Sequence, residues 1–217
     1  MKTKVKICCI SSITEANLAV SYGADALGIV SQMPSGPGVI SDDKIPGIIE
    51  SVPGYIDTFL LTSKVDPEQI ISQQKKFKPK TLQLVDEVDI NVYGVLKKEL
   101  PGINIVQVVH VTGDSSLEYA VKVSEYVHGI LLDSGNPDLA VKELGGTGRT
   151  HNWNISRKIC ESVNVPVYLA GGLNPDNVRK AIETVQPYGV DLCSGVRTDG
   201  ALDEFKLNKF FEAVMDS

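Results

Sequence analysis

Short apolar runs alternate with amphipathic segments along the whole chain, and eight such pairs can be counted. The apolar runs contain few polar residues, which is typical of parallel strands that are covered on both faces. We predict strands over residues 4–10, 26–30, 57–62, 81–85, 104–110, 127–133, 165–170 and 189–193. Helices are predicted over residues 12–23, 42–51, from 66, 88–100, from 114, 155–163, from 174 and around 207–214.

Eight strand–helix units in succession predict an α/β fold, a single-domain (β/α)8 TIM barrel that covers residues 1–217. The competing architecture is an open, doubly wound parallel sheet. That alternative is disfavoured because no GxGxxG motif follows the first predicted strand. No linker, repeat or low-complexity tract divides the chain into smaller units.

Glycines follow the seventh and eighth predicted strands, as Gly171-Gly172 and as Ser194-Gly195. Glycine lets the backbone approach a ligand closely, and free backbone N–H groups near a helix start attract anions. In a (β/α)8 barrel the loops after strands 7 and 8 are a frequent phosphate site. These two pairs therefore predict a phosphate held by backbone groups.

The composition of the chain argues against several classes of binding partner and indicates the cellular compartment of the protein. The net charge of −6 and pI near 5.1 argue against a nucleic-acid footprint, and no apolar run is long enough for a membrane span. There is no secretory signal pattern at the start. The cysteines at 8, 9, 160 and 193 form no CxxC motif and do not pair with histidine at ligand spacing. We therefore expect a reduced, cytoplasmic protein that holds no metal.

Cys8 and Asp133 carry the strongest chemical signal in the sequence. They end the first and sixth predicted strands, so they would face each other across the barrel mouth. A thiolate is a competent general base and a carboxylic acid can donate a proton, which suits proton transfer in a sugar phosphate without a cofactor. The competing interpretations are a small buried cysteine and an aspartate that serves a turn or helix cap.

Four segments together resemble the phosphoribosylanthranilate isomerase family: KICCISS, LLDSGNPDLAVKELGGTGRTHNW, PVYLAGGLNPDNVRKAI and GVDLCSGVRTDGALD. The resemblance runs in order through the whole chain. It implies a cofactor-free Amadori rearrangement of N-(5'-phosphoribosyl)anthranilate in tryptophan biosynthesis. By the family pattern, Asp133 is the general acid that opens the furanose ring and Cys8 is the general base that removes the C2' proton. The phosphate would be held by Gly146, Thr147, Gly148, Gly171, Gly172, Ser194 and Gly195.

The chain departs from the family on the substrate side. Gly38 stands where the family has an arginine that recognises the anthranilate, Cys9 replaces a glycine, and Arg197 replaces a glutamate. A histidine is missing after the fourth predicted strand, where the sequence is QLVD, and Leu202 replaces a lysine.

Lys6, Gly38, Arg149 and Arg197 are the candidate substrate-side positions, and Arg149 or Arg197 could replace the lost cation. Three interpretations stay open: an isomerase on the family substrate, an isomerase on another phosphoribosyl amine, or a non-catalytic binder of a phosphate ligand. We expect a phosphoribosylated small molecule as the only ligand class, and a monomer or a homodimer.

Overall fold

Eight parallel strands hydrogen-bond in chain order and close into a barrel in the computed structural model, which describes residues 2–34, 36–135 and 148–215. The barrel closes where β1 pairs with β8, with Val5 opposite Val190. Its strands are β1 (Lys4–Ile7), β2 (Ala26–Val30), β3 (Asp57–Thr62), β4 (Thr81–Leu84), β5 (Asn104–His110), β6 (Gly129–Asp133), β7 (Val167–Leu169) and β8 (Gly189–Leu192).

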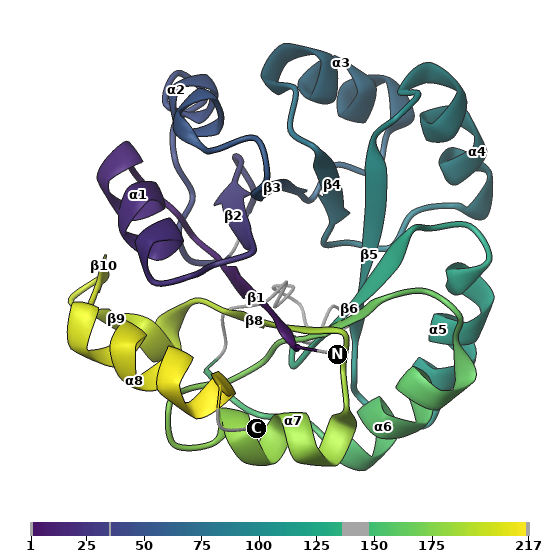
Figure 1. The fold of residues 1–217 in the computed structure, drawn as a ribbon. Helices are drawn as coiled ribbons and strands as arrows, with labels where there is room; N and C mark the ends of the chain where they lie inside the picture. The colour runs from purple at the N-terminus through teal and green to yellow at the C-terminus, as the bar shows by residue number, and fades with distance from the viewer. Residues whose placement is uncertain (1, 35, 136–147, 216–217) are drawn as a thin grey trace.

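Helices form an outer ring around the strands, as Figure 1 shows. They are α1 (Ile13–Ser21), α2 (Ile45–Ser51), α3 (Pro67–Phe77), α4 (Ile90–Glu99), α5 (Ser115–Ser124), α6 (Trp153–Ser162), α7 (Val178–Val185) and α8 (Glu204–Met215). The predicted (β/α)8 barrel is therefore confirmed. A short 3-10 helix η1 (Ser194–Val196) and a small hairpin of β9 (Arg197–Thr198) and β10 (Ala201–Leu202) lie between β8 and α8, and the sequence analysis did not predict them.

The predicted helix starts are confirmed in part. Ser12 caps α1, accepting a hydrogen bond from the Glu15 N–H. The small residues Ala16 and Ala19 of α1 and the apolar face of α7 are buried, whereas Ile13 is 48% exposed. Helix α7 begins at Val178 rather than near residue 174, since a turn precedes it.

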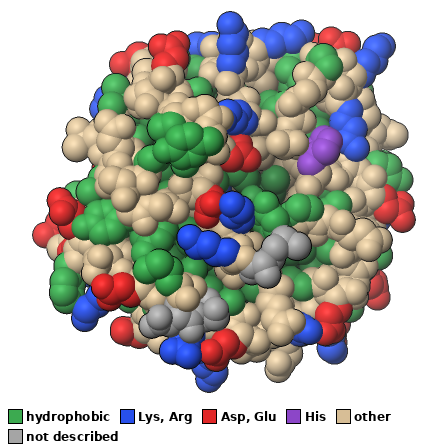
Figure 2. Space-filling model, viewed as in Figure 1, with side chains coloured by type: hydrophobic (Ala, Val, Ile, Leu, Met, Phe, Trp, Pro, Cys, Tyr) green, Lys and Arg blue, Asp and Glu red, His purple; other side chains and the backbone are tan. Residues whose placement is uncertain are grey.

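The core has two parts on either side of the strands. The larger part lies between the barrel and the helices, and a smaller one, which includes Cys8, Phe59 and Leu131, fills the barrel interior. On the face shown in Figure 2, basic and acidic side chains are interspersed and do not gather by sign. Among the helices of the described residues, none has both the length and the hydropathy that crossing a bilayer requires.

Candidate active site

A pocket opens at the carboxyl ends of the strands, where the loops after β1, β2, β6, β7 and β8 converge. Both predicted catalytic residues, Cys8 and Asp133, line it. Its wall on the β2 to β6 side is largely apolar: Val30, Leu61, Val85, Val108 and Leu131 line it, together with the polar Gln83. Such a lining suits an aromatic or sugar ring and strengthens the electrostatic effect of the few charged groups that it surrounds.

Cys8 follows β1 directly, and its N–H donates to the Leu192 carbonyl 2.8 Å away in β8. This bond fixes the residue at the closure of the barrel. Gly28 on the neighbouring strand makes room for the thiol, because a Cβ there would lie 2.7 Å from Cys8 Sγ. Burial raises the pKa of the Cys8 thiol to about 11, although the Lys6 ammonium acts to lower it. Cys8 is therefore a thiol in the free protein near neutral pH.

Lys6 and Asp191 form a buried ion pair beneath Cys8, with 2.8 Å between Lys6 Nζ and Asp191 Oδ1. The ammonium also lies 5.1 Å from the centre of the Phe59 ring. Burial acts to lower the Lys6 pKa, but the charges of Asp191 and Cys8 outweigh it and raise the pKa. Lys6 is therefore a fixed positive charge inside the barrel. It is not among the residues that line the pocket, and its charge acts on Cys8.

Asp133 ends β6 and is 8% exposed. Its Oδ1 accepts a hydrogen bond from the Ser134 N–H at 2.7 Å, and His110 lies opposite it in register on β5. Burial raises the pKa of Asp133, against the lowering effects of the Ser134 N–H and of His110. A raised pKa keeps a larger share of the carboxyl protonated, and a protonated carboxyl can act as a general acid.

The predicted phosphate glycines come together at one side of the pocket. Gly171 and Gly172 follow β7 with φ of 83° and 63°, a backbone region that favours glycine. A side chain at Gly172 would also collide with the Arg149 backbone, its Cβ lying 2.6 Å from the Arg149 carbonyl carbon. Gly148 lines the pocket from the loop before α6. Gly146 and Thr147, which were predicted alongside it, lie outside the described residues.

The loop after β8 packs directly against the loop after β7. Ser194 lines the pocket at the start of η1. Gly195 is not among the lining residues; its α-carbon lies against the Leu173 carbonyl, so a side chain would not fit there. The predicted pair therefore divides into one residue that faces the pocket and one that lets the two loops pack closely.

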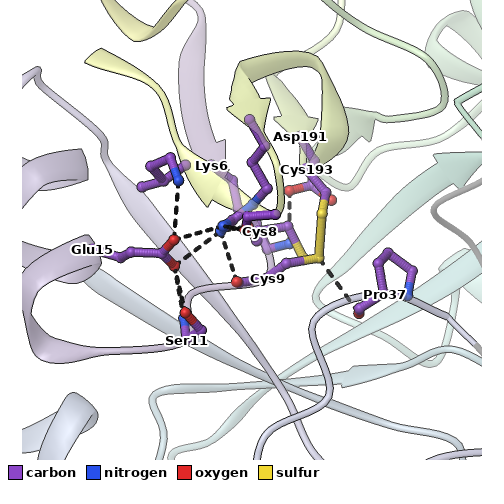
Figure 3. Close-up of a disulfide and its surroundings, with 11 residues drawn as sticks. Lys6, Cys8, Cys9, Ser11, Glu15, Pro37, Asp191 and Cys193 are labelled. Carbon is purple, nitrogen blue, oxygen red and sulfur yellow. Dashed lines mark hydrogen bonds and ion pairs between the residues drawn. A yellow bond between two sulfur atoms is a disulfide. The ribbon is translucent and has the colours of Figure 1, made fainter.

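Cys9 and Cys193 form a disulfide that joins the loop after β1 to the loop after β8, as Figure 3 shows. The expectation that all four cysteines are reduced is therefore wrong for this pair; Cys8 and Cys160 are free. Both bonded cysteines line the pocket. The closure of the barrel brings them together, because the register that places Ile7 opposite Leu192 puts the Cys8–Cys9 turn beside Cys193. Their separation of 184 residues in the chain gives no such signal.

Gly38 packs directly against Cys9 and has a φ of 76°. A Cβ at position 38 would collide with the Cys9 side chain and would lie 2.9 Å from its Cα. The neighbouring residues Gly36 and Pro37 line the pocket, whereas Gly38 does not. The Cys9 side chain thus occupies the space that the Cβ of any larger residue at position 38 would need.

Arg197 does not replace the missing cation. Its guanidinium pairs with Glu15 at 2.7 Å and donates to the Cys9 carbonyl at 2.7 Å, outside the pocket lining. Arg149 is exposed, and its backbone lies against Gly172. The charged residues that line the pocket, within the described part of the chain, are Asp133 and Asp191. Sequence analysis missed Glu15 and Asp191, although a charged residue inside an apolar strand was a signal for Asp191.

Comparison with known proteins gives a consistent result. The family model described as N-(5'phosphoribosyl)anthranilate (PRA) isomerase matches residues 5–213. The N-(5'-phosphoribosyl)anthranilate isomerase of Methanosarcina acetivorans is 34% identical, over 99% of this chain and 94% of that protein.

Solved structures of similar fold cover nearly the whole chain. A phosphoribosylanthranilate isomerase from Thermotoga maritima matches with a TM-score of 0.84 and 29% identity, over 99% of this chain and 100% of that one. Monomers generated from the dimeric T. maritima enzyme match with a TM-score of 0.79 and 26% identity, with the same coverage. An isomerase in complex with reduced 1-(o-carboxyphenylamino)-1-deoxyribulose 5-phosphate matches with a TM-score of 0.81 and 27% identity, again over 99% and 100%.

Proposed function

The chain belongs to the N-(5'-phosphoribosyl)anthranilate isomerase family, and we propose that it performs this isomerisation with Asp133 as general acid and Cys8 as general base. The reaction is a step of tryptophan biosynthesis and needs no cofactor. One observation carries the assignment of roles: a thiol and a buried carboxyl from different strands line one pocket, beside two glycine loops.

Asp133 starts the reaction by donating its proton to the ring oxygen of the ribose. The C1'–O bond breaks as the nitrogen lone pair forms a C1'=N double bond, which gives an iminium and leaves Asp133 as a carboxylate. A raised pKa serves this step because it keeps the proton on the acid until the ring oxygen takes it.

Cys8 then removes the proton from C2' of the iminium. The electrons of the C–H bond form a C1'=C2' double bond, and the electrons of the C1'=N bond return to nitrogen. A proton gained at C1' and one lost from the C2' hydroxyl give the amino ketone, so the overall change is an isomerisation. The Lys6 ammonium supports the thiolate form of Cys8 that this step requires.

The two roles set the dependence of turnover on pH. Cys8 acts when deprotonated and has its pKa raised to about 11, so turnover rises with pH while the thiolate fraction grows. Asp133 acts when protonated, so its active fraction falls as pH exceeds its raised pKa. Turnover follows the product of the two fractions, so a plot of kcat/KM against pH is bell-shaped.

The phosphate would bind between Gly148, Gly171, Gly172 and Ser194, with Gly195 letting the two loops meet. This end of the substrate does not react, so its binding energy can orient the reacting carbons between Cys8 and Asp133. Gly146 and Thr147 complete the set that we propose from the family pattern.

The test is turnover of freshly prepared phosphoribosylanthranilate by the wild-type protein, followed as loss of anthranilate-type fluorescence and checked by identification of the deoxyribulose product. We expect turnover without any added metal or cofactor. A protein that binds the reduced product analogue but turns over no substrate would contradict the proposal and favour a binder of phosphate ligands.

A second candidate substrate follows from the pocket lining. The described lining has two carboxylates and no basic side chain, whereas anthranilate carries a carboxylate of its own. A related phosphoribosyl amine that lacks this carboxylate would meet less repulsion. A higher kcat/KM on such an amine than on phosphoribosylanthranilate would favour this candidate.

We further propose that residues 1–217 act as one domain in the cytoplasm, as a monomer or a homodimer. A dimeric relative and monomers generated from it share the fold, so the fold is compatible with both states. Light scattering on the purified chain distinguishes the two. A larger stable assembly would contradict this part of the proposal.

A further inference from the structure

The turn that carries Cys8 and Cys9 is held from outside the pocket by Arg197. One guanidinium nitrogen, Nη2, donates to the Cys9 carbonyl at 2.7 Å and lies 3.3 Å from the Cys8 carbonyl. The other, Nη1, donates to the Gly200 carbonyl at 2.8 Å. One side chain from the hairpin after β8 therefore fixes the direction of two successive peptide groups at the end of β1.

Glu15 fixes the guanidinium in turn. Its two carboxylate oxygens lie 2.7 Å and 3.1 Å from Arg197 Nη1 and Nη2, a bidentate arrangement in which both side chains are buried. Glu15 also accepts hydrogen bonds from the Ser11 N–H at 2.9 Å and the Leu202 N–H at 3.1 Å. Figure 3 shows Glu15 and Ser11 beside Cys9. The carboxylate is therefore fully engaged and leaves Arg197 little freedom to turn.

The backbone that this pair holds has an uncommon conformation. Cys9 has a φ of 63°, in the left-handed region that residues with a side chain rarely adopt. Such a conformation persists only when surrounding contacts fix it, and these occur most often at functional sites. In this conformation the Cys9 N–H forms a hydrogen bond to Cys8 that favours the thiolate. The Cys9 peptide thus links Arg197 on one side to the Cys8 sulfur on the other.

We propose that Arg197, held by Glu15, is a positioning residue for the general base: it fixes the Cys8–Cys9 turn so that the Cys8 sulfur faces the pocket and receives the Cys9 N–H. This inference rests on the role of Cys8 proposed above. Three charged groups face Cys8 in addition: Lys6 on its own strand, Asp191 on β8 and Asp133 on β6. Arg197 acts on Cys8 through the backbone and contacts neither the substrate pocket nor the sulfur.

The experiment compares Arg197→Met, Arg197→Lys and Glu15→Gln with the wild-type enzyme. For Arg197→Met we expect kcat to fall about 10- to 100-fold, KM to change less than about threefold, and the limb of the pH profile that belongs to the base to move to higher pH. Arg197→Lys should restore part of kcat because an ammonium can still donate to a carbonyl. Arg179→Met is the matched control, since it removes an exposed Arg–Glu pair on α7 and should leave every readout unchanged.

The rate of Cys8 alkylation by iodoacetamide as a function of pH provides a readout that needs no turnover. Peptide-resolved mass spectrometry separates Cys8 from the other free cysteine, Cys160 on α6, which serves as an internal control. We expect Arg197→Met to move the alkylation profile of Cys8 to higher pH and to leave that of Cys160 in place. This measurement separates failure of the inference from failure of the proposed reaction.

A folded Arg197→Met variant that keeps the wild-type kcat and the wild-type pH profiles for turnover and alkylation would overturn the inference. If this variant does not fold, Glu15→Gln decides the matter, because glutamine keeps the shape of the side chain but holds the guanidinium less firmly. We expect a smaller shift in the same direction. A lower melting temperature without any change in kcat or in Cys8 alkylation would show a structural role only.

Discussion

The two ends of the pocket are built in different ways. The phosphate end consists of backbone from the loops after β7 and β8, and its key positions, Gly171 and Gly172, have positive φ. The other end consists of side chains and of the loops after β1 and β2, where Cys9 lies against Gly38, and its bond to Cys193 joins it to the loop after β8. The first end depends on backbone conformation, and the second depends on side chains that share space.

The difference shows how each end of the pocket responds to substitution. A backbone site depends on glycines at fixed positions, since any side chain at Gly172 would collide with the Arg149 backbone. A side-chain site depends on which of two neighbours fills a shared space. Cys9 and Gly38 share one space, so a larger side chain at position 38 requires a smaller residue at position 9.

Among the variants that test this comparison, the largest effect is expected from breaking the phosphate end. Gly172→Val should raise KM at least tenfold and lower the free energy of unfolding by about 2 kcal/mol or more, because a left-handed residue with a side chain is strained and this one also collides. Steady-state kinetics and urea denaturation measure the two effects. Gly54→Ala is the control, since a Cβ there meets open space; equal effects in both variants would contradict a special role for Gly172.

A second variant tests the shared space at the other end. Gly38→Arg alone should lower stability by about 1–3 kcal/mol and should not improve KM, because its Cβ collides with Cys9. Cys9→Gly removes the collision but also the disulfide, so the double variant Cys9→Gly/Gly38→Arg is compared with Cys9→Gly alone. In that background the arginine should cost little stability and should tighten KM for phosphoribosylanthranilate. Denaturation and kinetics on the four members of this cycle give the coupling energy. Additive effects would show that the two positions are independent.

The disulfide should stabilise the chain by about 2–4 kcal/mol, because it joins segments far apart in sequence and restricts the unfolded state. We expect Cys193→Ser to lower the melting temperature of the protein and to make it insensitive to dithiothreitol. Wild-type protein should shift to the same temperature when it is reduced. An unchanged wild-type melting temperature on reduction, with Cys9 and Cys193 shown to be bonded beforehand, would contradict this contribution.

The smallest effect is expected from removing the carboxylate of the substrate. A basic partner for that group would contribute about 1.5–3 kcal/mol, or roughly 10- to 150-fold in kcat/KM. Since the described pocket lining has no basic side chain, N-(5'-phosphoribosyl)aniline and phosphoribosylanthranilate should differ less than about tenfold in kcat/KM. A strong preference for the carboxylate would show that a cation reaches this end of the pocket.

The sequence was sufficient for the barrel and for the positions of the glycines at the proposed phosphate end. Strand periodicity, the cap at Ser12 and the glycine pairs are local signals, and local signals determine strands, helix starts and backbone geometry. Contacts between distant segments were not predictable in the same way. The pairing of Arg197 with Glu15 depends on the unexpected hairpin after η1, and the Cys9–Cys193 bond depends on the register with which the barrel closes.

The central claim is that Cys8 and Asp133 perform the chemistry in a pocket whose affinity comes from its phosphate end. The most direct measurement is kcat on phosphoribosylanthranilate for Cys8→Ser and Asp133→Asn, together with the Kd of the reduced product analogue. We predict that kcat falls about 10²- to 10⁴-fold in each variant while Kd changes only a few fold. Full turnover in either variant, or a loss of kcat matched by an equal loss of affinity, would contradict the account.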